Sequence, residues 1–131
     1  MESLQVKTRS RIEFIDITSQ VKQVIAKSGV KEGAAVVYVS HTTAGITINE
    51  AADAAVVEDI IATLNQLVPY RDKYKHAEGN SDAHIKSSLV GCSAHLIISD
   101  GAPILGTWQG IFFCEFDGPR SRKVLIKLLP A

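Results

Sequence analysis

The stretch from His76 to Ser88 gathers more ligand and proton-transfer groups than a surface loop requires. It reads His-Ala-Glu-Gly-Asn-Ser-Asp-Ala-His-Ile-Lys-Ser-Ser, and Ile85 is its only large apolar residue. The two histidines are eight positions apart, too far to meet on adjacent turns of one helix. They can still converge if residues 78–82 turn back, for which Gly79 supplies backbone freedom. Such a stretch is typical of a metal or phosphate site.

A third imidazole, His41, follows an apolar run and is expected at the end of a strand. Three histidines with one open position form a known catalytic zinc site, in which the metal lowers the pKa of bound water to about 7. We therefore predict a divalent metal ion, with zinc favoured and magnesium or manganese as alternatives, bound by His41, His76 and His84. His95 opens the apolar run 96–98, so a structural role is expected for it.

Three carboxylates are candidate catalytic residues: Glu78, Asp82 and Glu50. A carboxylate beside a metal-bound histidine orients its ring. A carboxylate beside bound water can act as a general base. The alternative for Glu78 and Asp82 is an ordinary solvated loop charge.

A further group offers charged, hydroxyl, amide or aromatic contacts to a phosphorylated small molecule. Trp108 lies between Gly106 and Gly110 and could frame an aromatic ligand, the alternative being a core position. No P-loop or GxGxxG pattern is present, so these phosphate cradles are not predicted. The substrate-binding candidates are Thr42, Thr43, Asn80, Lys86, Ser87, Ser88, Trp108 and Arg120.

The composition favours one folded domain over residues 1–131. Hydrophobic residues make up 46% of the chain, which argues against disorder. Fourteen basic residues balance fourteen acidic ones, so the basic surplus of a general nucleic-acid-binding protein is missing. No apolar run approaches the roughly 20 residues of a membrane span, and the first residues lack a signal-peptide core. We expect a cytoplasmic protein without nucleic-acid or membrane partners.

Cys92 and Cys114 are the only cysteines. Their spacing fits neither a disulfide framework nor a CxxC metal pair. We expect both to be small buried apolar residues.

Hydrophobic periodicity predicts strands over residues 4–8, 11–17, 34–40, 46–49, 95–98, 108–116 and 123–129. Two helices are predicted over residues 19–27 and 53–67, the first capped by Thr18 and ended by Gly29. Asp53 and Pro69 bound the second helix. The pattern indicates an α+β fold: a single compact domain with a largely antiparallel β-sheet or sandwich and two main helices on one face.

Three motifs together resemble the YjbQ-like family, also called the secondary thiamine-phosphate synthase family. They are His-Thr-Thr-Ala-Gly-Ile-Thr-Ile-Asn-Glu from His41 to Glu50, the stretch His76 to Ser88, and Leu-Gly-Thr-Trp-Gln-Gly from Leu105 followed by Asp-Gly-Pro-Arg from Asp117. The resemblance covers essentially the whole chain.

This resemblance implies a compact α+β domain assembled as a homotrimer, with His41, His76 and His84 as metal ligands. It also implies a low thiamine-phosphate synthase activity that joins a pyrimidine pyrophosphate to a thiazole phosphate. Pyrophosphate departure usually uses magnesium with oxygen ligands, whereas three imidazoles suit zinc. Metal-dependent hydrolysis of a phosphorylated small molecule, or binding of a metal or phosphate ligand without turnover, therefore remain alternatives.

The segment Ile111-Phe112-Phe113 gives a separate indication of self-assembly. It places apolar side chains on both faces of a predicted strand, and we expect a small domain to leave one of these faces for another copy.

Overall fold

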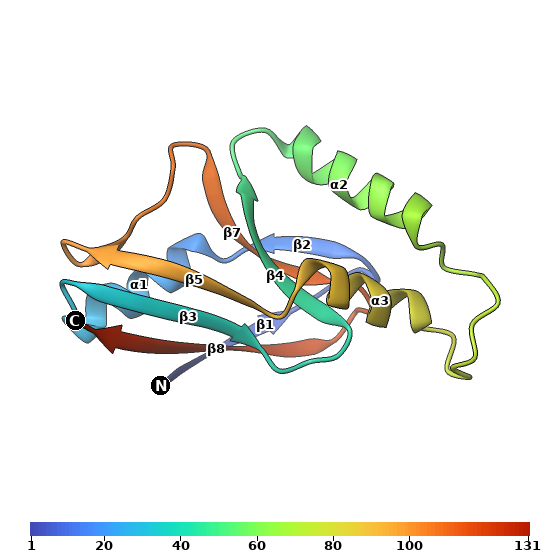
Figure 1. Ribbon diagram of the computed structural model, residues 1–131, viewed down its shortest axis with the longest axis horizontal. Helices are drawn as coiled ribbons and strands as arrows, with labels where there is room; N and C mark the ends of the chain where they lie inside the picture. Colours follow the sequence, from blue (N-terminus) through green and yellow to red (C-terminus); the bar gives the residue numbers. More distant parts are fainter.

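The computed structural model describes residues 1–131 as two antiparallel sheets and three helices (Figure 1). The larger sheet has the strand order β1-β8-β3-β5-β6, and the smaller sheet the order β2-β7-β4. The larger sheet consists of β1 (Glu2–Lys7), β8 (Ser121–Pro130), β3 (Gly33–Val39), β5 (Ser93–Ser99) and β6 (Ala102–Pro103). The smaller one consists of β2 (Glu13–Asp16), β7 (Gln109–Glu115) and β4 (Ala44–Glu50). The α+β class and the single compact domain are confirmed.

The main hydrophobic core lies where the two sheets meet, and α1 (Thr18–Ser28) closes it with Val21 and Ile25. Side chains alternate across a strand, so β7 turns Ile111 and Phe113 toward this core. The same alternation turns Phe112 and Cys114 to the opposite face of the smaller sheet. The two sheets therefore pack as a sandwich.

A second core covers that opposite face, under α2 (Ala54–Leu67) and α3 (Ser81–Val90). Ala83 of α3 joins Phe112, and Val57 and Leu64 of α2 pack against this cluster. The three helices thus pack against two different cores, and the expectation of helices on one face is wrong. The chain covers both faces of residues 111–113, so this segment gives no indication of assembly.

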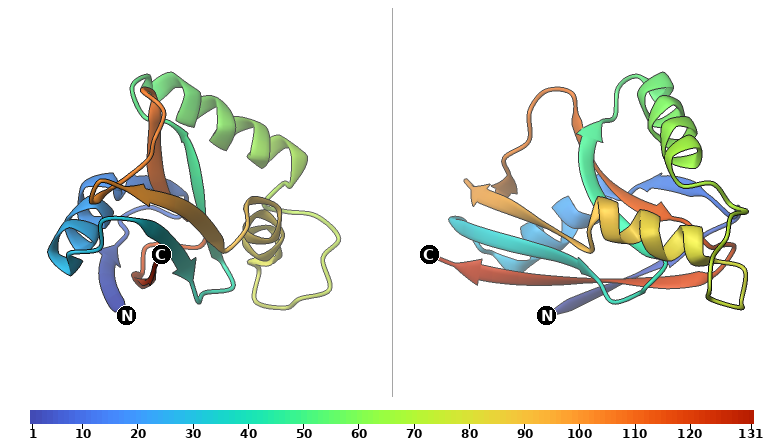
Figure 2. Two further views of the ribbon diagram at one scale, coloured as in Figure 1. Left: turned by 60° about the vertical axis from the view of Figure 1, so that its left-hand side comes forward. Right: turned by 45° about the vertical axis from the view of Figure 1, so that its right-hand side comes forward.

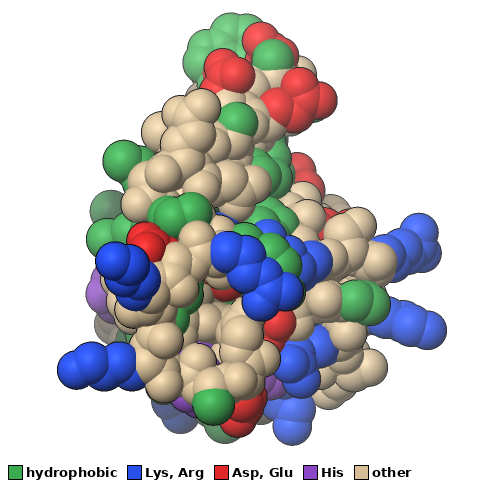
Figure 3. Space-filling model, turned by 90° about the vertical axis from the view of Figure 1, so that its right-hand side faces the viewer, with side chains coloured by type: hydrophobic (Ala, Val, Ile, Leu, Met, Phe, Trp, Pro, Cys, Tyr) green, Lys and Arg blue, Asp and Glu red, His purple; other side chains and the backbone are tan.

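The helix predicted over residues 53–67 is confirmed as α2, with the Asp53 side chain accepting the amide hydrogen of Ala55 at 3.0 Å. None of its residues is fully buried. α2 stands at the edge of the molecule, and the region where it begins carries hydrophobic and acidic side chains in the space-filling view (Figures 2 and 3). No helix of the chain is both long and apolar enough to span a bilayer.

α3 occupies a segment for which the sequence predicts only a turning loop. Its buried side is formed by polar and small residues rather than by an apolar stripe: Ser81, Asp82, Ala83, Lys86 and Ser87. A search for hydrophobic periodicity cannot find a helix whose inward face is polar.

The predicted end of α1 at Gly29 is confirmed, whereas the predicted cap at Thr18 is wrong. Gly29 ends the helix in a left-handed conformation, with φ of 77°. Thr18 is the first helical residue rather than the cap, because its hydroxyl is used elsewhere and accepts the amide hydrogen of Ile111 at 2.8 Å. This bond ties the start of α1 to β7.

Candidate functional site

Four segments meet at one end of the sandwich and form a polar hollow of about 450 Å³, here called the histidine pocket. They are the β3–β4 turn, the loop 68–80, the start of α3 and the β7–β8 turn with the first residues of β8. No hydrophobic residue lines the pocket. Its lining residues are Ser40, His41, Thr42, Thr43, His76, Glu78, Asn80, His84, Asp117, Arg120 and Arg122.

His76 and His84 converge in this pocket as predicted. Their ring centroids are 5.3 Å apart and the rings are nearly perpendicular, at 87°. Gly79 turns the chain between them with φ of 80°, after which α3 carries His84 back toward the loop. Glu78 stays close, with its Oε2 3.9 Å from Nε2 of His76.

His41 reaches the same pocket from the end of β3 but is already hydrogen-bonded. Its Nε2 accepts the backbone N–H of Lys123 at 3.0 Å. Burial, reinforced by the charge of Arg122, lowers the pKa of His41, so the ring favours its neutral form. A neutral imidazole that accepts at Nε2 carries its proton on Nδ1, which leaves Nδ1–H as a donor.

The three imidazoles fit a metal ion in part. No three His, Cys, Asp or Glu side chains converge closely enough to hold one ion. The His76–His84 spacing nevertheless matches the roughly 5 Å expected between the rings of two imidazoles on one tetrahedral ion. His41 could supply a lone pair only by giving up its bond to Lys123. His76 and His84 are therefore the two ligands the geometry favours.

The charged residues that line the pocket balance one another. Glu78 and Asp117 are the two carboxylates, and Arg120 and Arg122 are the two guanidinium groups. A bound divalent ion would make the site positive and able to hold a phosphate.

A buried ion pair of Glu115 and Arg122, not singled out in the sequence, borders the pocket. Glu115 is fully buried, and its carboxylate accepts from Arg122, from Thr8 Oγ1 at 2.7 Å and from the Asp117 amide at 3.0 Å. Burial alone would raise the pKa of Glu115, but the hydrogen bonds from Arg122, Asp117 and Thr8 outweigh it and hold the pKa below its usual value.

Arg122 is fixed by these bonds with one nitrogen to spare. Its Nε donates to Glu115 at 2.9 Å, and its Nη2 donates to Glu115 and to Thr43 Oγ1 at 2.9 Å. Nη1 has no such partner in the chain, and Arg122 lines the pocket. The sequence contained a signal, since Arg122 lies at the same two-residue spacing as the fully buried Val124 and Ile126 and so shares their face of β8.

Asp82 and Lys86 lie outside the pocket, against the expectation that one moves protons and the other holds phosphate. Both are fully buried. Lys86 Nζ contacts Asp82 Oδ2 at 3.0 Å and Asn65 Oδ1 at 2.8 Å, and Arg11 Nη1 contacts the same Asp82 oxygen at 3.1 Å. These bonds fix α3 to α2 and to Arg11, so both residues position the helix that carries His84.

The remaining phosphate candidates divide into two groups. Arg120 and Asn80 line the pocket and both donate to Asp117 Oδ2, at 3.0 and 2.8 Å. Asn80 Oδ1 is buried without a hydrogen-bond partner. Ser87 donates to the carbonyl of Thr42 at 2.6 Å and Ser88 to that of His84 at 2.9 Å, so neither hydroxyl proton is free.

Glu50 and Trp108 lie at the end of the smaller sheet that is remote from the histidine pocket. β4 and β7 pair so that Ala44 is opposite Glu115 near the histidines, whereas Glu50 is opposite Gln109 at the far end. Trp108 is 64% exposed, so the core alternative for it is wrong. The motifs that contain these two residues extend away from the site.

Cys92 is exposed and Cys114 is buried, so the expectation of two buried cysteines holds only for Cys114. His95 lies exposed on β5 and lines neither hollow beside the histidines. It has no part in the site.

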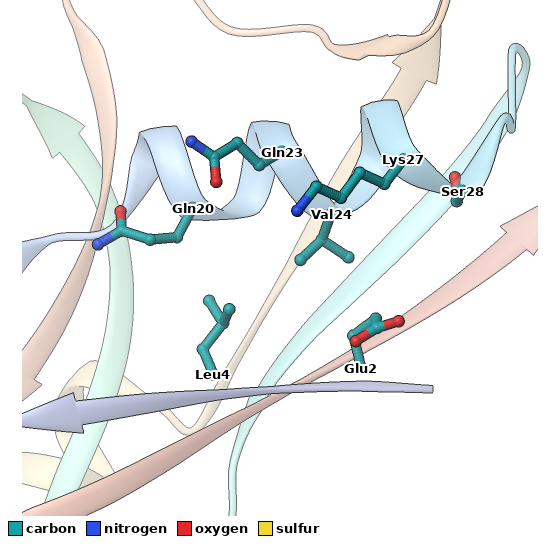
Figure 4. Close-up of a pocket in the computed structure, with 7 residues that line it drawn as sticks. All are labelled: Glu2, Leu4, Gln20, Gln23, Val24, Lys27 and Ser28. Carbon is teal, nitrogen blue, oxygen red and sulfur yellow. The ribbon is translucent and has the colours of Figure 1, made fainter.

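A separate hollow lies between α1 and β1 (Figure 4). It has a volume of about 300 Å³ and no imidazole among its lining residues. Glu2 and Lys27 are its only charged residues, so it lacks the group types that carry chemistry in the histidine pocket.

The chain is similar to proteins of archaea and bacteria along its whole length. A family described as UPF0047 protein YjbQ-like matches residues 2–131. A UPF0047 protein of Methanocaldococcus jannaschii is 60% identical, covering 95% of this chain and 91% of its own length. The UPF0047 protein YugU of Bacillus subtilis is 50% identical, covering 98% of both chains.

Solved structures show the same fold. A YjbQ/UPF0047 protein of Clostridium acetobutylicum is 53% identical and covers 98% of this chain and 100% of its own, with a TM-score of 0.97. A YbjQ-like protein of unknown function from Sulfolobus solfataricus is 33% identical and covers 99% and 96%, with a TM-score of 0.95. The chain belongs to the YjbQ/UPF0047 family.

Proposed function

We propose that the chain binds a phosphorylated small molecule in the histidine pocket, together with a divalent metal ion, and catalyses a reaction at its phosphate. The observation that carries this proposal is a pocket lined only by non-hydrophobic residues, among them three histidines and two arginines. Zinc is the preferred ion because imidazoles dominate the donors, with magnesium and manganese as the alternatives to test.

The phosphate would be bound by donors that the fold leaves free. They include Nη1 of Arg122, held in place by Glu115, and the Nδ1–H of His41. Arg120 lies beside them and is 54% exposed, so it can turn toward a ligand. A fixed guanidinium binds phosphate more strongly than a mobile cation because less side-chain freedom is lost.

His76 and His84 would hold the metal ion, with Glu78 nearby. When bound, such an ion polarises a phosphate oxygen or activates water. Glu78 is the remaining candidate for the general base, because Asp82 is fully buried and Glu50 is remote from the histidine pocket. The exposed position of Glu78 allows it to exchange protons with solvent.

Thiamine-phosphate synthase activity is the first reaction to test, since both of its substrates carry phosphate groups. Its support is the resemblance of the three motifs to the secondary thiamine-phosphate synthases. Hydrolysis of a phosphate ester would use the same groups. A protein that binds metal or phosphate without turnover is the third alternative.

We further propose a homotrimer, supported by the same resemblance and by α2. Val56, Ile60 and Leu64 line a hollow on α2, and Leu67 at its end is 70% exposed. Another copy of the chain would cover this apolar surface. Sedimentation equilibrium showing a monomer at micromolar concentration would contradict the trimer.

The test of the metal combines metal analysis of purified protein with alanine variants of His41, His76 and His84. We expect about one ion per chain in the wild type. His76→Ala and His84→Ala should lose it, whereas His41→Ala should retain more of it because His41 is bonded to Lys123. Unchanged metal content in all three variants would contradict the proposed site.

The test of the reaction measures thiamine-phosphate formation and phosphate-ester hydrolysis with added zinc, manganese or magnesium. Glu78→Gln keeps the size of the side chain and removes its charge. We expect it to lower kcat and leave phosphate affinity unchanged, since a general base acts in the transition state. If the wild type binds phosphate but has no turnover with any ion, the binding alternative replaces the enzyme.

A further inference from the structure

A second hollow adjoins the histidine pocket on the side where α3 ends. It has a volume of about 530 Å³ and shares His41, Thr42 and His84 with the histidine pocket. The two hollows are therefore neighbouring parts of one depression that meet at these three residues. Its other lining residues are Ala44, Ser87, Ser88, Gly91 and Cys92.

Gly91 lines the second hollow at the point where the chain leaves α3. Gly91 follows the last turn of α3 with φ of 97°, a conformation that favours glycine. A Cβ atom at Gly91 would meet no other atom within 4 Å, so the residue borders open space. A Cβ at Gly45 would instead lie 2.6 Å from the Gly91 carbonyl, so β4 packs closely against the backbone of Gly91.

The chemistry of the second hollow contrasts with that of the histidine pocket. It contains no Lys, Arg, Asp or Glu. The hydroxyl protons of Ser87 and Ser88 are committed to backbone carbonyls. Ala44, Gly91 and Cys92 add carbon and sulfur surface, so the hollow suits an uncharged, weakly polar group.

We propose that the second hollow binds the uncharged organic group of a phosphate ester whose phosphate lies in the histidine pocket. This inference rests on the proposed function, because it requires a phosphate beside Arg122. His41, Thr42 and His84 would then contact the ester where its two parts join. The protein would prefer organic phosphate esters over inorganic phosphate because the ester also buries apolar surface.

The chain carries a natural reporter of this hollow. Cys92 is exposed and lines it, whereas Cys114, the only other cysteine, is fully buried. Burial raises the pKa of Cys114, so its thiol does not compete for an alkylating reagent. Alkylation by iodoacetamide, followed by mass spectrometry, therefore measures access to Cys92.

The experiment compares phenyl phosphate with inorganic phosphate, with and without one equivalent of manganese. We expect phenyl phosphate to slow the alkylation of Cys92 at least about fivefold at saturation, and inorganic phosphate to leave the rate unchanged. Cys92→Trp should fill the hollow and weaken phenyl phosphate about tenfold or more without changing the affinity for inorganic phosphate. Cys92→Ser keeps the size and is the matched control.

The outcomes separate the two proposals. Phenyl phosphate could bind more weakly to Arg122→Lys than to the wild type, yet neither protect Cys92 nor lose affinity in Cys92→Trp. In that case the second hollow does not bind the organic group, and the phosphate site stands. If neither phosphate compound binds under any condition, the proposed function and this inference both fail. Protection of Cys92 by inorganic phosphate alone would also overturn the inference.

Discussion

Two buried ion pairs lie near the histidines, and they differ in which side-chain atoms remain free to bind a ligand. Glu115 and Arg122 join β7 of the smaller sheet to β8 of the larger one. Asp82 and Lys86 lie on α3 and join it to Asn65 of α2. Only the first pair reaches the pocket, through Arg122.

The two carboxylates also differ in how many of their oxygens accept hydrogen bonds. Both oxygens of Glu115 accept hydrogen bonds, from Arg122, Thr8 and the Asp117 amide. Asp82 uses Oδ2 alone, and its Oδ1 is buried without a partner. A fully satisfied pair can hold one guanidinium nitrogen toward a ligand, whereas the Asp82 pair only fixes a helix. A cluster of charges in the sequence therefore does not by itself define a functional site.

Removing the charge of Glu115 should have the largest effect. Glu115→Gln leaves Arg122 buried without its counter-charge, so we expect the free energy of unfolding to fall by about 3 kcal/mol. Urea denaturation followed by circular dichroism measures this change. Glu2→Gln, at an exposed position on β1, is the matched control and should change the free energy of unfolding by less than about 0.5 kcal/mol. Equal stabilities of the two variants would contradict the structural importance of the pair.

Seven of the eight strands and α2 could be predicted from the sequence because apolar residues reveal them, whereas the two-residue β6 could not. Val56, Val57, Ile60, Ile61 and Leu64 recur at helical spacing, and α2 follows them. α3 could not be predicted in this way, because it buries Asp82 and Lys86 where an ordinary helix buries apolar side chains. For the same reason, the polar content of the segment predicts a loop.

The candidate site was predicted in part. The convergence of His76 and His84 followed from the turn at Gly79. The contribution of Glu115 and Arg122 depends on the pairing of distant strands, which brings Thr8 and Thr43 beside them. Such long-range contacts leave little trace in local spacing.

Asp82→Asn should have the second-largest effect and should affect stability rather than binding. Lys86 would lose its buried carboxylate partner, while Arg11 is partly exposed and keeps some solvation. We expect the free energy of unfolding to fall by about 2 kcal/mol, with inorganic phosphate affinity changed less than about twofold. Asp72→Asn, in the exposed loop, is the control. A loss of turnover with unchanged stability would restore Asp82 as a catalytic base.

Arg122→Lys tests whether the free Nη1 of the Glu115–Arg122 pair binds phosphate in the pocket. Lysine keeps the charge beside Glu115 but cannot supply a second nitrogen in the position of Nη1. We expect inorganic phosphate to bind about tenfold more weakly, measured by isothermal titration calorimetry. Arg9→Lys, at an exposed position, should bind phosphate as the wild type does. Unchanged affinity in Arg122→Lys would show that the ion pair is structural, like that of Asp82.

The smallest effect should be a difference in acid stability between the wild type and Glu115→Gln. The pKa of Glu115 is held below its usual value in the folded protein, so the folded state binds this proton less readily than the unfolded state. The stabilisation from the carboxylate is therefore complete above the unfolded pKa of about 4.3 and is lost as the pH falls through the lower folded value. The stability gap between wild type and Glu115→Gln should accordingly be constant from about pH 7 to pH 5 and shrink below about pH 4. Urea denaturation at a series of pH values measures the gap, and a gap that widens as the pH falls would mean that the buried carboxylate is protonated more easily in the folded protein.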